Sequence, residues 1–158
     1  MMTLLNALHG VALGVWVGGM LLAAAVATPA AFKALPPEAA GKFLGEFFPR
    51  YYLFGSVCGT ITLATLLLLL INRHFLPSSL VREGAVALML ALTLYAGYGL
   101  HPKIRALKTV MHAAQSPDRE KVEAQNRFVR LHRQSVQLNA VVLLTGLALL
   151  AWRSSSRG

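Results

Sequence analysis

Residues 66–71 read Leu-Leu-Leu-Leu-Leu-Ile, and this run decides the fold class of the chain. Only helices and closed barrels satisfy all their backbone hydrogen bonds inside a bilayer. The strands of a membrane barrel alternate apolar and polar residues, and an unbroken aliphatic run does not fit that alternation. We therefore expect residues 66–71 to lie in a transmembrane helix.

Three further apolar stretches flank this run, so the chain is expected to cross the membrane four times. The predicted spans cover residues 4–32, 51–72, 82–101 and 134–152, and about 20 residues suffice to cross the hydrocarbon layer. The chain has 158 residues, of which 56% are hydrophobic and 13% are charged, whereas soluble domains carry about 25% charged residues. A soluble globular enzyme is excluded. The sequence predicts one all-α domain, a bundle of four transmembrane helices.

Basic residues are divided unevenly between the two sides of the predicted bundle. Eleven of the fifteen Lys and Arg residues lie in the loops that join the first to the second and the third to the fourth span. Because cytoplasmic loops are enriched in Lys and Arg, both long loops are predicted to be cytoplasmic and both termini outside. Short loops and the lack of a targeting segment favour the bacterial cytoplasmic (inner) membrane. The net charge of +9 then suits anionic lipid headgroups, and no nucleic-acid partner is expected.

The first long loop is predicted to contain a helix of its own. Pro36 and Pro37 are suited to the start of a helix, and apolar residues recur at helical spacing as far as Phe48. Pro49 is expected to end this helix before the second span begins. The segment is predicted to lie in the membrane interface as an amphipathic helix.

The second long loop is predicted to form a cytoplasmic helical extension. His101-Pro102 is expected to close the third span, and a separate helix is expected over residues 103–114. Ser116 and Pro117 are typical of an N-cap and a first helical position. The helix that starts there is expected to continue without interruption into the fourth span.

Glycines recur every four residues in the first two spans. They are Gly10, Gly14 and Gly18 in the first span, and Gly55 and Gly59 in the second. Small residues let transmembrane helices approach closely, so these positions are predicted to be helix-packing contacts. They also suggest a third functional hypothesis, a homo-oligomer or a structural subunit of a membrane complex.

Polar and aromatic residues share one face of the first span and one face of the fourth. Unpaired polar groups are costly against lipid, so both faces are predicted to turn inward and form a partly polar seam. The candidate ligand-binding residues are His9, Trp16, Met20, His132, Ser135 and Asn139. No charged residue lies deep in a predicted span, which disfavours a proton-driven carrier. The leading hypothesis is that this seam binds or exports a small molecule or a soft metal.

Two pairs of histidines lie at matching depths of the predicted bundle, His101 with His132 and His9 with His74. Imidazole is a common iron ligand and helix bundles can hold a haem ring, so a haem b-binding or quinone-reactive redox module is the alternative hypothesis. Each histidine also reads as an interfacial hydrogen-bonding residue. The sequence requires no cofactor and contains no catalytic constellation, so no catalytic residue is predicted and an enzyme is disfavoured.

Several motifs resemble the transmembrane protein 205-like family. They are Leu8-His9, Trp16-Val17-Gly18-Gly19-Met20, Phe47-Phe48-Pro49-Arg50-Tyr51-Tyr52, His101-Pro102 and Leu131-His132-Arg133-Gln134-Ser135 with Leu138-Asn139. The resemblance extends over nearly the whole chain and implies a four-helix membrane domain of unknown function. A eukaryotic member is associated with resistance to a platinum drug, which implies export or metal handling. The first span alone resembles copper-resistance membrane domains and haem-associated four-helix oxidases.

Overall fold

The computed structural model of the chain describes residues 2–72, 77–113 and 117–155, and every regular element in these ranges is helical. In chain order the elements are α1 (Met2–Leu22), the π-helical turn η1 (Ala23–Ala27), α2 (Thr28–Ala34), α3 (Pro37–Asn72), α4 (Pro77–Leu94), the π-helical turn η2 (Tyr95–Leu100), α5 (His101–His112) and α6 (Asp118–Ser155).

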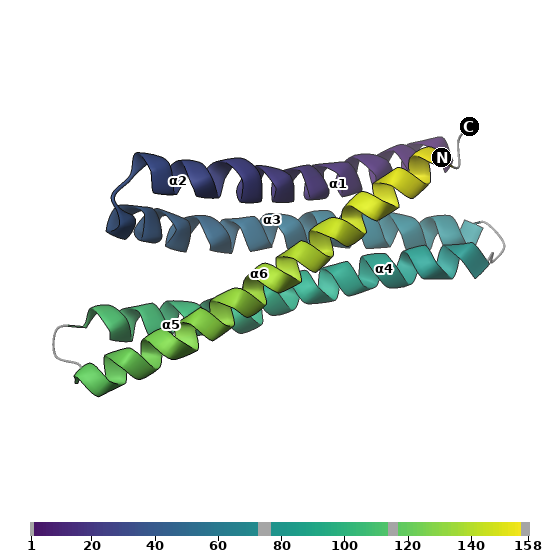
Figure 1. Cartoon of the computed structure of the whole chain (residues 1–158). Helices are drawn as coiled ribbons and strands as arrows, with labels where there is room; N and C mark the ends of the chain where they lie inside the picture. Colours follow the sequence, from purple (N-terminus) through teal and green to yellow (C-terminus); the bar gives the residue numbers. More distant parts are fainter. Residues whose placement is uncertain (1, 73–76, 114–116, 156–158) are drawn as a thin grey trace.

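Four continuous helical stretches run side by side as a bundle (Figure 1). The stretch from α1 to α2 packs along α3, α4 packs against α3, and α6 crosses α4 and pairs with α5. Both ends of the described chain lie at one end of the bundle, which we call the termini end. The end of α2, the start of α3, the end of α5 and the start of α6 lie at the opposite end, the basic end.

The four stretches are long and apolar enough to cross a membrane. They comprise Met2–Ala34, Pro37–Ile71, Leu80–Met111 and Asp118–Trp152, and each overlaps one predicted span. Large apolar side chains also cover the outside, since Leu4, Ile71 and Leu144 are 65% to 78% exposed. Such a surface requires lipid around it. The predicted all-α bundle of four membrane-spanning helices is confirmed, and the chain is a multi-pass membrane protein.

Two prolines, Pro29 and Pro102, are accommodated within helical stretches by π-helical turns. The η1 turn directly precedes Thr28-Pro29, and the η2 turn directly precedes His101-Pro102. The His101 backbone N–H donates to the Ala96 carbonyl, five residues back. Proline clashes with the carbonyl four residues before it, and a wider turn relieves that clash. The chain therefore stays helical through His101-Pro102, so the third span and the helix expected over residues 103–114 form one continuous helical stretch.

The prediction that Pro49 ends a separate interfacial helix is wrong. Pro49 lies inside α3, so the expected amphipathic helix and the second span form one helix of 36 residues. Pro49 has no backbone N–H to donate to the carbonyl of Gly45. The Arg50 guanidinium donates to the carbonyl oxygen of the next residue, Glu46, at 2.6 Å. Rings on both sides of Pro49 pack together as well, Phe47 against Tyr51 and Phe48 against Tyr52. These contacts hold the helix together across the proline.

The fourth stretch agrees with expectation, because α6 begins at Asp118 and continues unbroken to Ser155. The Pro117 carbonyl accepts from the Glu120 and Lys121 backbone N–H groups at 3.0 and 3.1 Å. The predicted N-cap Ser116 lies outside the described residues.

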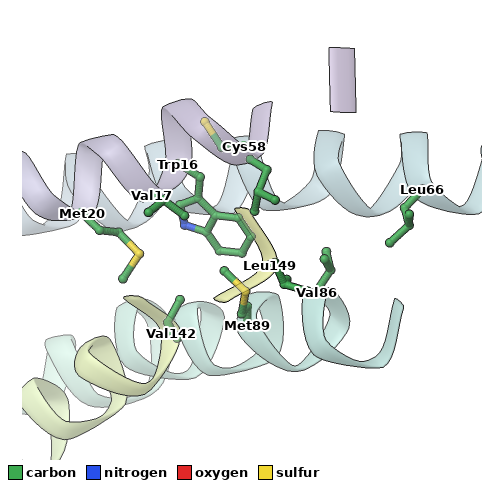
Figure 2. Close-up of a cluster of buried hydrophobic side chains, with 10 residues drawn as sticks. Trp16, Val17, Met20, Cys58, Leu66, Val86, Met89, Val142 and Leu149 are labelled. Carbon is green, nitrogen blue, oxygen red and sulfur yellow. The ribbon is translucent and has the colours of Figure 1, made fainter. Parts of the chain in front are cut away.

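An apolar core fills the middle of the bundle around Trp16, whose side chain is 1% exposed (Figure 2). The buried cluster includes Val17 and Met20 of α1, Val86 and Met89 of α4, and Val142 and Leu149 of α6. Gly59 of α3 makes room for the indole, since a Cβ there would lie 2.8 Å from Trp16 Cη2. The polar residues of the bundle are thereby divided into two groups, one toward each end.

Candidate functional site

The first polar group joins α3 to α6 on the basic-end side of Trp16. We call Tyr51, Tyr52, Ser135 and Asn139 the tyrosine cluster. Tyr51 Oη donates to Asn139 Oδ1 at 3.0 Å, and Asn139 Nδ2 donates to Tyr52 Oη at 3.0 Å. Tyr52 Oη and Ser135 Oγ lie 3.0 Å apart and share a hydrogen bond. The cluster therefore connects two helices through side chains alone.

Local sequence explains why these four groups meet. Ser135 and Asn139 are four residues apart, so they lie on one face of α6, and Asn139 Nδ2 also donates to the Ser135 carbonyl at 2.9 Å. Tyr52 is buried and reaches α6 past Gly97 of η2. A Cβ on Gly97 would lie 2.6 Å from the Tyr52 Cβ, so a side chain there would displace the ring.

Counting hydrogens shows that the tyrosine cluster holds a donor in excess. Both amide hydrogens of Asn139 are used, on Tyr52 Oη and on the Ser135 carbonyl. Tyr51 donates its hydroxyl hydrogen to Asn139 Oδ1. Tyr52 and Ser135 have two hydroxyl hydrogens for the single bond between them. Whichever hydroxyl donates, the hydrogen of the other is not used in any of the hydrogen bonds between these four side chains.

Aromatic rings flank this excess donor. The His101 ring lies edge-on to Tyr52, with centroids 5.9 Å apart, and 6.3 Å from the ring of Phe48. Phe47 stacks on Tyr51 at 6.2 Å. Planar groups prefer such surroundings because ring faces and edges attract each other. The tyrosine cluster thus combines hydrogen-bonding groups with aromatic ring surfaces at one level of the bundle.

The second polar group lies on the termini-end side of Trp16. We call His9, Thr62 and Thr65 the histidine cluster. His9 Nδ1 lies 3.2 Å from the Thr62 carbonyl oxygen and 3.4 Å from Thr65 Oγ1. The Thr65 hydroxyl already donates to the carbonyls of Ile61 and Thr62, so we assign the hydrogen to His9 Nδ1, which donates to both oxygens. His9 is 2% exposed, and both of these oxygens belong to α3.

The other predicted site residues are distributed over different surroundings. Trp16 and Met20 belong to the apolar core, and His132 is exposed with its ring stacked on Phe128 at 5.7 Å. His101 faces Phe48 and Tyr52 of α3, so it and His132 contact different rings. The fourth predicted histidine, His74, lies outside the described residues.

A metal centre finds little support in this arrangement. Within residues 2–72, 77–113 and 117–155, no three His, Cys, Asp or Glu side chains gather closely enough to hold a metal ion. The soft donors Met20 and Cys58 lie on different sides of the Trp16 ring, and Met89 packs in the same apolar cluster (Figure 2). Cys58 is buried in the apolar core.

The predicted packing glycines fall into two sets. Gly55 and Gly59 contact the core closely, with Cβ positions 3.1 Å from Trp16 Nε1 and 2.8 Å from Trp16 Cη2. A Cβ on Gly14 or Gly18 would meet nothing within 4 Å, so the close packing predicted there is not made within this chain. Because 100° separates successive residues, these two glycines lie nearly opposite Trp16 on α1. Gly10 is half-buried.

Sequence reasoning missed a buried carboxylate, Glu83 of α4. Its side chain is 8% exposed, and Oε1 has no hydrogen-bond partner within the described ranges. Glu83 is the second residue of the predicted third span, and a charged residue at that position is usually taken to lie at the membrane surface. It lies three residues before the fully buried Val86, and this helical spacing places both residues on the inward face of α4. Tyr51 and Tyr52 were also missed as site residues, although they end the Phe-Phe-Pro-Arg-Tyr-Tyr motif.

Comparison with known protein families now adds a classification to this geometry. Residues 11–113 match the family DUF4149, described as a domain of unknown function, and this stretch is more than half of the chain. The chain belongs to the DUF4149 family. No curated protein and no solved structure matches it significantly.

The DUF4149 match covers only part of the tyrosine cluster. It includes Tyr51, Tyr52 and His101, whereas Ser135 and Asn139 of α6 lie beyond residue 113. The match supports a domain of unknown function, as the sequence motifs implied, but does not support the transmembrane protein 205 name. The family description carries no activity, so the chemistry of this DUF4149 chain rests on its own side chains.

Proposed function

We propose that the protein binds a small membrane-soluble molecule whose planar headgroup carries carbonyl oxygens, and that it binds this headgroup at the tyrosine cluster. The observation that carries the proposal is the excess hydroxyl hydrogen of the Tyr52–Ser135 pair. A donor without an acceptor in an apolar environment costs free energy. A ligand carbonyl that accepts this hydrogen removes the cost.

The surroundings of that donor favour a planar ligand over a purely aliphatic one. Rings of Phe48, Tyr52 and His101 lie within about 6 Å of one another by centroid distance, and quinone-like headgroups stack on such rings. A long apolar tail would extend along the exposed aliphatic surface of the bundle, as lipid does. Quinones are therefore the class with which we would begin.

The packed core argues for binding and against a path for export or metal tolerance. Trp16, Val86 and Val142 are each 1% exposed, and they fill the bundle between the two polar clusters. A carrier would need to open this core during each cycle. Metal binding has less support than ligand binding at the tyrosine cluster, because no three His, Cys, Asp or Glu side chains of the described residues gather closely enough to hold a metal ion.

We further propose that the basic end faces the cytoplasm in the bacterial inner membrane. The end of α2, the start of α3, the end of α5 and the start of α6 lie at that end (Figure 1), and eleven of the fifteen basic residues lie in the corresponding loops. Single-cysteine variants at Lys42 and at Thr3, both exposed and made on a Cys58→Ser background, test this orientation with a membrane-impermeant maleimide applied to intact cells. Labelling is expected at Thr3→Cys alone, and labelling at Lys42→Cys alone would invert the topology.

The binding proposal is tested by thermal unfolding of the purified protein in lipid nanodiscs with decylubiquinone as the probe. A ligand that binds only the folded state raises the unfolding midpoint. We expect a rise for the wild type and for Tyr98→Phe, a matched control at an exposed tyrosine (61% exposed). Tyr52→Phe and Asn139→Leu are expected to lose most of it.

An equal rise in all four proteins would place quinone binding elsewhere and overturn the assignment to the tyrosine cluster. No rise in the wild type would favour a structural role, in which the cluster only joins α3 to α6. Co-purification of a stoichiometric partner protein would then support the assembly-subunit hypothesis.

A further inference from the structure

A groove between α5 and α6 at the basic end is lined almost entirely by apolar atoms, including those of three basic side chains. It has a volume of about 430 Å³ and is lined by Lys103, Ala106, Leu107 and Val110 of α5 and by Arg127, Arg130 and Leu131 of α6. Its volume is in the range of small-molecule sites. The groove is separate from the tyrosine cluster, because none of its lining residues belongs to that cluster.

The charges of the groove are unbalanced. Arg127 pairs with Glu123 at 2.7 Å, whereas Lys103 and Arg130 have no ion pair among the described residues. The floor consists of four apolar side chains, Ala106, Leu107, Val110 and Leu131. The groove therefore matches an anion that also carries apolar groups, and it matches a simple inorganic anion less well.

The position of the groove points to the membrane surface. Lys103 follows the predicted end of the third span by two residues, and Arg130 precedes the predicted start of the fourth by four residues. At 1.5 Å per residue, both lie within roughly 6 Å of the hydrocarbon edge, in the headgroup layer of the bilayer. Basic pockets between membrane helices at this depth bind anionic lipid headgroups.

We propose that this groove binds one anionic phospholipid from the surrounding leaflet. Lys103 and Arg130 contact the phosphate, and the apolar floor packs against the glycerol backbone and the first acyl carbons. Arg127 contributes on the outer rim, where Glu123 shares its charge. This inference does not depend on a ligand at the tyrosine cluster.

The test is native mass spectrometry of the protein released from nanodiscs of phosphatidylglycerol and phosphatidylcholine in equal amounts. We expect one retained phosphatidylglycerol per chain in the wild type. The double variant Lys103→Gln/Arg130→Gln is expected to lower that retention at least tenfold. The control Lys42→Gln/Arg133→Gln removes the same charge from exposed positions outside the groove and is expected to retain the lipid.

Two further arms distinguish a lipid from a free anion. Leu107→Asn removes part of the apolar floor and is expected to weaken lipid retention without changing the charge. Inorganic phosphate at millimolar concentration is expected not to displace the lipid, and full displacement would reassign the groove to a free phosphate. Equal loss in the control double variant, or no retained lipid in the wild type, would overturn the proposal. Circular dichroism melting of each variant verifies that the exposed substitutions leave the bundle folded.

Discussion

The tyrosine cluster and the histidine cluster both place polar side chains inside the bundle, but they satisfy them differently. The imidazole of His9 bonds to a backbone carbonyl and a threonine of one helix, α3. In the tyrosine cluster, side chains of α3 and α6 bond to one another, and each of the four makes a hydrogen bond to another member. The hydrogen count leaves a donor in excess only in the tyrosine cluster.

The histidine cluster satisfies its buried polar groups by itself, whereas the tyrosine cluster can accept a ligand. Threonine and histidine on adjacent helices satisfy each other within the membrane at modest energetic gain. A network between helices fixes their relative rotation, and its excess donor can bind an acceptor from outside the protein. We therefore place ligand binding at the tyrosine cluster and assign the histidine cluster to helix packing.

The largest loss of stability is expected when the side chain between the two clusters, Trp16, is removed. Trp16 is 1% exposed and lies between them, and large aromatic-to-alanine changes in a core cost about 3–5 kcal/mol. Trp16→Ala is expected to lower the free energy of unfolding by that amount. Trp152→Ala, at a residue 48% exposed, is expected to cost far less. Equilibrium unfolding in SDS followed by circular dichroism measures both, and equal effects would contradict the central position of Trp16.

The two clusters themselves are compared by matching substitutions to leucine. Asn139→Leu removes the partner of both tyrosines and is expected to cost about 1–2 kcal/mol. His9→Leu is expected to cost less than about 1 kcal/mol, because the Thr62 carbonyl keeps the Thr65 hydroxyl as donor. The same SDS titration gives both values. A larger cost at His9 than at Asn139 would reverse the assignment.

Glu83, at the termini end, is a buried residue whose Oε1 has no hydrogen-bond partner among the residues that the structure describes. Because an unsatisfied buried acceptor destabilises the folded state, Glu83→Leu is expected to raise the free energy of unfolding by about 1 kcal/mol. Glu123→Gln, at an exposed ion pair, serves as the control and is expected to change it by less than about 0.5 kcal/mol. A clear loss of stability in Glu83→Leu would mean that the carboxylate is paired in the membrane.

The smallest expected effect concerns the ion pair between Arg105 of α5 and Glu46 of α3. Arg105 and Glu46 lie 3.3 Å apart, with both side chains more than half exposed. Exposed pairs of this kind contribute about 0–1 kcal/mol. A double-mutant cycle with Arg105→Gln and Glu46→Gln is expected to give a coupling below about 0.5 kcal/mol. A larger coupling would indicate that this pair holds α3 and α5 together.

Hydropathy was sufficient to predict the four helices, because an unsatisfied backbone in lipid leaves few alternatives. It could not predict that the helices continue through Pro49 and Pro102, since this depends on a π-helical turn and on ring contacts across the proline. Ser135 and Asn139 were predicted to face inward, and the structure brings them together with Tyr52. The tyrosines were missed because a tyrosine at a membrane boundary usually reads as an interfacial anchor.

The rotation of α1 about its axis could not be predicted from the sequence pattern either. The glycine stripe of the first span predicted close packing at Gly14 and Gly18, but Trp16 occupies the side of α1 that faces α3 and turns those glycines outward. Gly55 and Gly59 receive the indole instead. Which small residues become contacts is therefore decided by the large residue on the opposing helix.

The most direct test of the account is photo-crosslinking with an azido-substituted quinone in nanodiscs, followed by peptide mapping. If the headgroup binds at the tyrosine cluster, we expect labelled peptides of α3 around Tyr51 and Tyr52 and of α6 around Ser135 and Asn139. Excess decylubiquinone is expected to suppress this labelling. Suppressible labelling around His9 and Thr62 instead would place the site at the termini end and contradict the central claim.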